Sequence, residues 1–176
     1  MPYVLARDAP DRFFVGIDAN AAALRRFSGR ADRERLFNLV YVRAAVEVLP
    51  SELTGVADCV TTILPWGSLL AAIARPSVEV LRCIRALCRP GATLTVVFGL
   101  DAGRDRAEAA RLGLPPLDGA HVRGVLTSGY AEAGYAVASI RPVDAGELAR
   151  WPSTWARRLA FGLTRPMIRI DATAER

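Results

Sequence analysis

Short apolar runs alternate with amphipathic segments along most of this chain, and this alternation restricts the possible folds more than any other feature. Short apolar runs between turn signals are typical of buried strands, whereas apolar residues recurring every three or four positions are typical of helices. The alternation predicts an α/β fold, a mainly parallel sheet with helices on both faces. We expect strands at 13–18, 39–44, 59–64, 93–100, 135–142 and 167–171, and helices at 20–35, 69–74, 78–88, 104–111, 121–133 and 153–160.

The length of 176 residues fits one domain (1–176) with room for a substantial core. No apolar run reaches the roughly 18 residues that a membrane span requires, and no signal peptide pattern is present at the start. We therefore expect a cytoplasmic protein with no membrane contact. All 23 basic residues are arginine, and the net charge of +5 is compatible with a nucleic-acid partner.

The cysteines and the single histidine give no metal-binding or nucleophilic pattern. Cys59, Cys83 and Cys88 lack metal-ligand spacing, and we interpret them as buried thiols, with Cys83 and Cys88 on one predicted helix. His121 lies in a helical pattern without a second histidine. A metal site and a Ser-His-Asp triad are therefore not expected.

Two of the predicted strands end in residues suited to ligand binding. In open α/β sheets, ligands bind beyond the carboxyl ends of the strands. Trp66 follows the 59–64 run between a proline and a glycine, which favours a strand-to-helix turn over a core position, although a core aromatic is the alternative. Asp18 ends the 13–18 run, where a carboxylate can accept hydrogen bonds from ribose hydroxyls. The alternative for Asp18 is helix capping, by itself or through Asn20.

Arginines and aromatic residues are interleaved near the carboxyl end of the chain. Residues 150–169 contain five arginines and no carboxylate, together with Trp151, Trp155 and Phe161. Such a pattern is typical of a surface that stacks bases and contacts phosphates. A solvated helix face in an arginine-rich chain is the alternative interpretation.

Several segments resemble the Kam/Npm-type aminoglycoside-resistance methyltransferases, in register along essentially the whole chain. The most specific are Pro-Trp-Gly-Ser at 65–68 and Trp-Ala-Arg-Arg-Leu-Ala-Phe-Gly at 155–162, supported by 15–20, 49–50 and 111–115. The resemblance implies a Rossmann-like class I S-adenosyl-L-methionine (SAM)-dependent methyltransferase. It also implies methylation of N1 of a decoding-site adenine in helix 44 of 16S rRNA, on the 30S subunit, by a monomer that uses no metal and releases S-adenosyl-L-homocysteine.

The resemblance also assigns cofactor roles by position. Asp18 would hold the SAM ribose beside Ala19, and Val46 and Glu47 would border the adenine of SAM. The residues that would line the cofactor and its methyl-donor end are Ile63, Ser68 and Ser153. Helix N-capping is a second role for Ser153, and the two roles are compatible.

The same resemblance assigns residues to RNA. Trp66 and Trp155 match a pair of tryptophans that holds the target base. Arg157, Arg158 and Arg165 match basic positions that engage rRNA phosphates. The segments 100–120 and 143–165 would be insertions between strands that carry substrate-recognition elements.

The chain departs from the family pattern at its start. The family binds the methionine end of SAM on a glycine-rich loop after a first strand, and this sequence contains neither. We expect an N-terminally incomplete domain, which three explanations fit: a truncated product, a segment supplied by a partner, or a relic. The alternative function is therefore that of a catalytically silent fragment or pseudoenzyme that binds rRNA in the 30S subunit.

Overall fold

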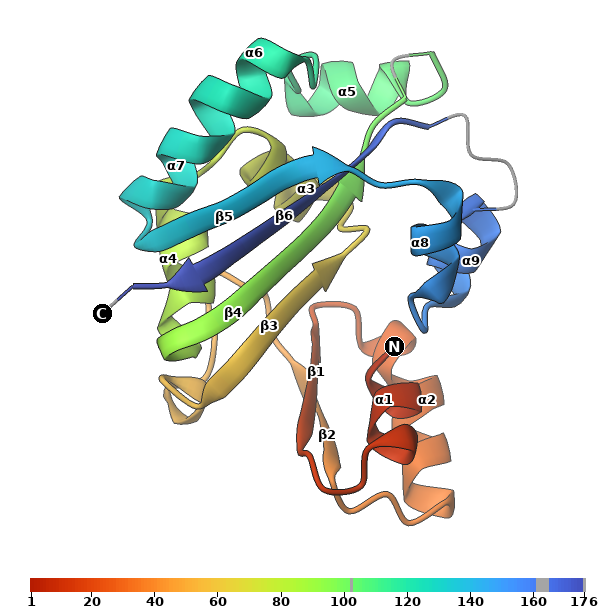
Figure 1. Ribbon diagram of the computed structural model, residues 1–176. Coiled ribbons are helices and arrows are strands. Elements are labelled where there is room, and N and C mark those ends of the chain that lie inside the picture. The colour runs from red at the N-terminus through yellow and green to blue at the C-terminus, as the bar shows by residue number, and fades with distance from the viewer. Residues whose placement is uncertain (102, 161–164, 176) are drawn as a thin grey trace.

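The computed structural model describes residues 1–101, 103–160 and 165–175, in which six strands form two sheets (Figure 1). The apolar runs predicted as strands all form strands, with shifts at their ends, the largest at the fourth strand, which begins five residues before the predicted position 93. The strands are β1 (Phe14–Asp18), β2 (Leu39–Arg43), β3 (Ala57–Ile63), β4 (Cys88–Gly99), β5 (Tyr135–Pro142) and β6 (Met167–Ala174).

The two sheets differ in size and in strand direction. The smaller sheet is the parallel pair of β1 and β2, in which Phe14 lies opposite Leu39 and Asp18 opposite Arg43. The larger has the order β3, β4, β6, β5, with β3 and β4 parallel and β6 antiparallel to both of its neighbours. The reversed direction of β6 was not anticipated from the sequence. Among the described residues no strand joins β1 to β3, and the β1 and β2 pair lies on the β3 side of the larger sheet (Figure 1).

Most helices pack against one face of the larger sheet, whereas the two at 145–150 and 154–160 cover only one end of the other face (Figure 1). The described helices are α1 (Pro2–Asp8), α2 (Ala21–Arg33), η1 (Ser51–Leu53), α3 (Gly67–Ala74), α4 (Val78–Ala86), α5 (Arg106–Leu112), α6 (Gly119–His121), η2 (Val122–Leu126), α7 (Thr127–Glu132), α8 (Ala145–Arg150) and α9 (Thr154–Ala160). No helix in the described ranges is long and apolar enough to cross a membrane.

Strand β4 contributes to two apolar clusters, one on each face of the sheet. Leu94, Val96 and Phe98 pack in a large cluster with side chains from α3, α4 and α7. Val97, between two of them in sequence, belongs to a second cluster, whose other buried members come from α8, α9, β6 and the segment between β5 and α8. Successive strand residues point to opposite faces, so this split places α8 and α9 on the face opposite α3 and α4.

The predictions for the cysteines were partly wrong. Cys88 begins β4 instead of ending a helix, because its backbone pairs with Ala57 and draws it into the sheet. Cys88 is buried, but Cys59 is exposed and Cys83 is half-buried. Burial raises the pKa of the Cys88 thiol. His121 lies on α6, where its Nε2 is 2.6 Å from the carbonyl oxygen of Ala74, a structural contact.

Candidate active site

Trp66 lies on the turn between β3 and α3. The amide of Leu64 donates to the carbonyl of Val97 on β4 at 2.7 Å, so the pairing with β4 continues to this residue. The φ of Leu64 is 53°, and this left-handed conformation turns the chain out of the sheet. Gly67 follows with a φ of 62°, a conformation that glycine adopts without strain. The Trp66 side chain is 52% exposed. The interpretation of Trp66 as a core aromatic is therefore wrong, and the predicted turn is confirmed.

Trp155 is presented by α9 and is also exposed, at 54%. Its neighbour Ala156 is fully buried in the cluster around Val97. Ile63 and Leu64, which immediately precede the Trp66 turn, pack against that same cluster. One apolar cluster thus anchors the backbones of both elements that carry an exposed tryptophan. It brings Trp66 and Trp155, which are 89 positions apart in sequence, into one region.

Ser153 caps helix α9. Its Oγ accepts a hydrogen bond from the amide of Ala156 at 3.3 Å, and its carbonyl accepts one from the amide of Arg157 at 3.0 Å. The capping role predicted for Ser153 is therefore confirmed. Because the cap fixes the first turn of α9, it also fixes the direction in which Trp155 leaves the helix.

Asp18 ends β1, and its side chain is exposed. One carboxylate oxygen, Oδ1, accepts from the amide of Asn20 at 2.8 Å. Asn20 is the residue that caps α2, through a hydrogen bond from the amide of Ala22. Capping is thus the role of Asn20, and it leaves Oδ2 of Asp18 available to a ligand.

The other predicted cofactor residues also follow strands or begin a helix. Val46 and Glu47 lie in the turn after β2, where Val46 is half-buried against the large cluster and Glu47 is exposed. Ala19 is exposed directly after β1. Ile63 is the last residue of β3, and Ser68 is exposed in the first turn of α3. Apart from Ser153, these residues lie at or shortly after the carboxyl ends of three strands, β1, β2 and β3.

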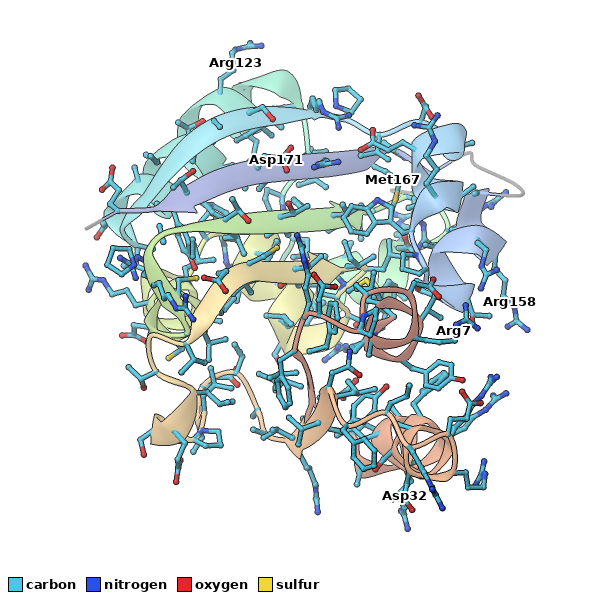
Figure 2. All side chains as sticks on the ribbon, turned by 60° about the horizontal axis from the view of Figure 1, so that its bottom comes forward. Arg7, Asp32, Arg123, Arg158, Met167 and Asp171 are labelled. Carbon is cyan, nitrogen blue, oxygen red and sulfur yellow. The ribbon has the colours of Figure 1, made fainter. Side chains whose placement is uncertain are left out.

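The three predicted RNA-binding arginines have different surroundings. Arg157 and Arg158 are exposed on α9, and Arg158 extends away from the fold in Figure 2. Arg165 is only 16% exposed, and its Nη2 donates to Oδ1 of Asp105 at 2.6 Å. Phe161, the third aromatic residue of the interleaved pattern, lies outside the described residues.

Sequence reasoning missed two acidic residues of this region. Asp105 is buried just before α5, and nothing in its local sequence distinguishes it from a loop carboxylate. Glu147 on α8 accepts from Arg141 at 2.6 and 2.8 Å and from Arg169 at 2.8 Å. These hydrogen bonds, from Arg141 first and then Arg169, lower the pKa of Glu147 to about 2. Asp105 binds Arg165, which is 60 residues away in sequence. Glu147 on α8 binds Arg141 on β5 and Arg169 on β6.

Within the described residues, no group of three or more His, Cys, Asp and Glu side chains could hold a metal ion. The α/β sheet with helices packed against it, and the polar residues at its strand ends, match the architecture of Rossmann-like class I methyltransferases.

Comparison with known proteins then identifies the family. The model of the NpmA family, 16S rRNA (adenine(1408)-N(1))-methyltransferase, matches residues 1–174, and the chain belongs to this family. The enzyme of that name from Streptoalloteichus tenebrarius is 37% identical over 163 residues, which cover 90% of this chain and 74% of the relative.

Solved structures of the family agree with the fold. The aminoglycoside-resistance methyltransferase NpmB1 superposes with a TM-score of 0.83 at 40% identity, covering 98% of this chain and 81% of the other. A mutant 16S rRNA (adenine(1408)-N(1))-methyltransferase from Catenulisporales acidiphilia, solved with the cosubstrate SAM, gives a TM-score of 0.82 at 33% identity. The match covers 99% of this chain and 80% of that one.

Proposed function

We propose that this chain transfers the methyl group of SAM to N1 of adenine 1408 in helix 44 of 16S rRNA, within the 30S subunit in the cytoplasm, and that it acts as a monomer. The methylation would confer aminoglycoside resistance. The observation that carries the proposal is the pair of exposed tryptophans, Trp66 and Trp155, on elements anchored by one apolar cluster. Family membership supports the same reaction.

The target atom explains the need for two exposed indoles. N1 of adenine is hidden in a base pair or a stack, so an enzyme must turn the nucleotide out and hold it. Each base stacked on an aromatic side chain gains about 1 to 3 kcal/mol. A methylated adenine is positively charged, and an indole face attracts cations. Trp66 and Trp155 would therefore hold the base and also favour its alkylated form.

The reaction needs little further help from side chains. N1 is a neutral ring nitrogen with a free lone pair, so no general base has to remove a proton from it. This agrees with a site in which the acidic side chains Asp105 and Glu147 are engaged by arginines.

The residues at the strand ends fit the nucleoside part of SAM. Oδ2 of Asp18 is available for ribose hydroxyls, and half-buried Val46 offers an apolar surface to the adenine, with Ala19 and Glu47 beside them. Ile63, Ser68 and Ser153 would line the methyl-donor end. When bound, SAM supplies a methyl group activated on a sulfonium. The chain's own residues would bind and orient the two reactants.

Basic residues of α9 would hold the RNA. Arg157 and Arg158 are exposed and have no carboxylate partner among the described residues, so both are free for phosphates. Arg165 would contact phosphate from its position beside Asp105. We propose that the chain is a single domain and that its segments 100–120 and 143–165 carry the contacts with the substrate RNA. Residues 102 and 161–164 of these segments lie outside the described residues.

The test is SAM-dependent methyl incorporation into purified 30S subunits, followed by primer extension. We expect a stop at adenine 1408, and a clearly weaker stop in the same reaction time when Trp66→Ala replaces the parent chain. Binding to 30S subunits without incorporation would contradict the proposal and favour the catalytically silent rRNA-binding fragment. Incorporation at another nucleotide would contradict the assigned target.

A further inference from the structure

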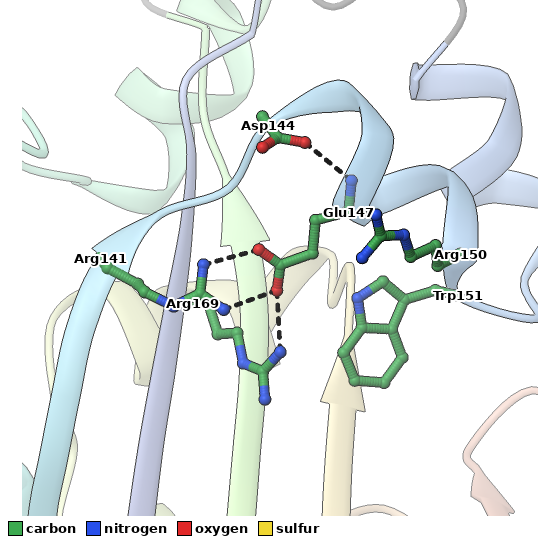
Figure 3. A pocket seen from close by; sticks show the side chains of 6 residues that line it. All are labelled: Arg141, Asp144, Glu147, Arg150, Trp151 and Arg169. Atoms are coloured by element: carbon green, nitrogen blue, oxygen red, sulfur yellow. Dashed lines mark hydrogen bonds and ion pairs between the residues drawn. The ribbon is translucent and has the colours of Figure 1, made fainter.

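A polar pocket of about 520 Å³ lies beside α8, in the proposed substrate-recognition segment but apart from the residues assigned to SAM and to the target adenine (Figure 3). Its volume is within the range of sites for small ligands, about 300 to 1,000 Å³. Its walls come from the ends of β5 and β6, from α8 and from the residue that follows α8. The lining residues are Arg141, Asp144, Glu147, Arg150, Trp151 and Arg169.

One side of the pocket is a fixed network of charges. Glu147 bridges Arg141 and Arg169, and Arg169 also donates to Oδ1 of Asp171 through Nε at 2.9 Å and Nη2 at 2.8 Å. Asp144 caps α8 by accepting from the amide of Glu147 at 2.8 Å. The carboxylates around the pocket are thus already engaged, which lowers their capacity to repel an anion.

The other side of the pocket carries Arg150 and Trp151 (Figure 3). Arg150 is exposed and forms no ion pair with any described carboxylate. Trp151 is half-buried, because it packs against the cluster around Val97, and the guanidinium of Arg169 lies 5.8 Å from the centre of its ring. The guanidinium of Arg150, which has no ion-pair partner among the described residues, therefore lies near the indole of Trp151, which the apolar cluster holds in place.

We propose that this pocket binds an unpaired nucleotide of the substrate rRNA, distinct from the target adenine. Arg150 binds its phosphate, and the indole of Trp151 stacks on its base, while the network of Arg141, Glu147 and Arg169 faces the polar edge of the base. Aromatic stacking combined with an arginine contact is the usual way in which proteins hold single-stranded nucleotides. The pocket adjoins α9, so the nucleotide would belong to the same RNA surface. The inference rests on the proposed function.

The test measures binding of the full chain to 30S subunits over a series of salt concentrations, without SAM. Each phosphate contact in single-stranded RNA contributes about 0.7 to the slope of log affinity against log salt. We expect Arg150→Gln to reduce the slope by about this amount. The matched control is Arg123→Gln, which removes the same charge from an exposed position at the top of Figure 2, away from Arg158 and α9 at the right. Equal slopes for the two variants would overturn the phosphate contact.

A second pair of variants tests the stacking. Trp151→Phe keeps an aromatic face and should bind close to the parent, whereas Trp151→Ala should bind about 5- to 150-fold more weakly, as the loss of one stacked base predicts. Circular dichroism checks that both fold. Equal affinities of the folded variants would overturn the stacking. If the parent chain itself fails to bind 30S subunits, the proposed function fails as well. If the parent binds and methylates while all pocket variants behave like it, only the pocket is overturned.

Discussion

Arg165 and Asp105 form an almost buried ion pair, with Nη2 of the arginine 2.6 Å from Oδ1 of the carboxylate. The other oxygen of Asp105 accepts from the amide of Asp101 at 2.9 Å. Arg165 lies just ahead of β6 and Asp105 just ahead of α5, so the pair ties together two segments that are 60 residues apart. Arg165 can therefore position the RNA-binding surface in addition to its proposed contact with phosphate.

Removing Arg165 should destabilise the fold. Arg165→Ala leaves the carboxylate of Asp105 buried without its cation, and losing one partner of a buried pair costs about 3 kcal/mol. The measurement is the free energy of unfolding in urea. The control is Arg158→Ala, an exposed position where the expected change is within about 0.5 kcal/mol. Equal effects of the two substitutions would show that the pair does not stabilise the chain.

Ser153 has a capping role and a proposed cofactor role, which two substitutions separate. Ser153→Ala removes the acceptor for the amide of Ala156 and should lower the free energy of unfolding by about 1 kcal/mol. Ser153→Thr keeps a hydroxyl cap and should stay close to the parent in stability. If methyl transfer nevertheless falls in the stable Ser153→Thr variant, Ser153 also shapes the pocket. Full activity of Ser153→Thr would leave the cap as its role.

The turn at Trp66 was predictable from sequence because its signals are local. A proline, a glycine and the end of an apolar run identify a strand-to-helix turn without any tertiary information. Asp18 was placed correctly at a strand end for the same reason. The capping of α9 by Ser153 was likewise visible in the sequence, since the residue precedes a helical pattern.

Contacts between distant segments could not be predicted in this way. The partners in the Asp105 and Arg165 pair are joined only by the tertiary fold, as are the partners of Glu147. The antiparallel direction of β6 has no local signal either, because a buried strand has the same composition in both directions. The start of β4 at Cys88 depends on pairing with Ala57 across the sheet.

The bridge at Glu147 predicts a stability contribution that depends on pH. The pKa of Glu147 is lowered to about 2 from an ordinary value of 4.5, so its contribution is complete above about 4.5 and is lost as the pH falls toward 2. Glu147→Gln should reduce the free energy of unfolding by about 2 kcal/mol at pH 7, and the difference from the parent should shrink at low pH. Urea unfolding at several pH values measures this. Exposed Glu132→Gln is the control, and a difference at Glu147 that does not change with pH would contradict the assignment.

Asp18 should matter for cofactor binding without affecting the fold. Asp18→Asn keeps an oxygen for the amide of Asn20 but loses the charge that strengthens hydrogen bonds from ribose hydroxyls. A hydrogen bond to a charged group contributes about 1.5 to 3 kcal/mol, so the Kd for SAM should rise about tenfold or more. Isothermal titration calorimetry gives the Kd, with exposed Asp11→Asn as the control. An unchanged Kd would remove Asp18 from the cofactor site.

Trp66 and Trp155 should contribute to RNA binding and catalysis with little effect on stability. Both side chains are more than half exposed, so Trp66→Ala and Trp155→Ala should unfold close to the parent. Each should weaken methyl transfer to 30S subunits about 5- to 150-fold, which corresponds to the loss of one base stack. Phe37→Ala, at an aromatic side chain that is 87% exposed on another part of the fold, should leave methyl transfer unchanged.

Single-turnover rates separate the two roles proposed for these indoles. If the tryptophans also favour the positively charged alkylated adenine, Trp66→Leu and Trp155→Leu should slow the chemical step even at saturating 30S subunits. A normal single-turnover rate with weakened binding would restrict both residues to holding the base. Because leucine keeps an apolar surface but has no π face, that comparison distinguishes the attraction for a cation from simple packing.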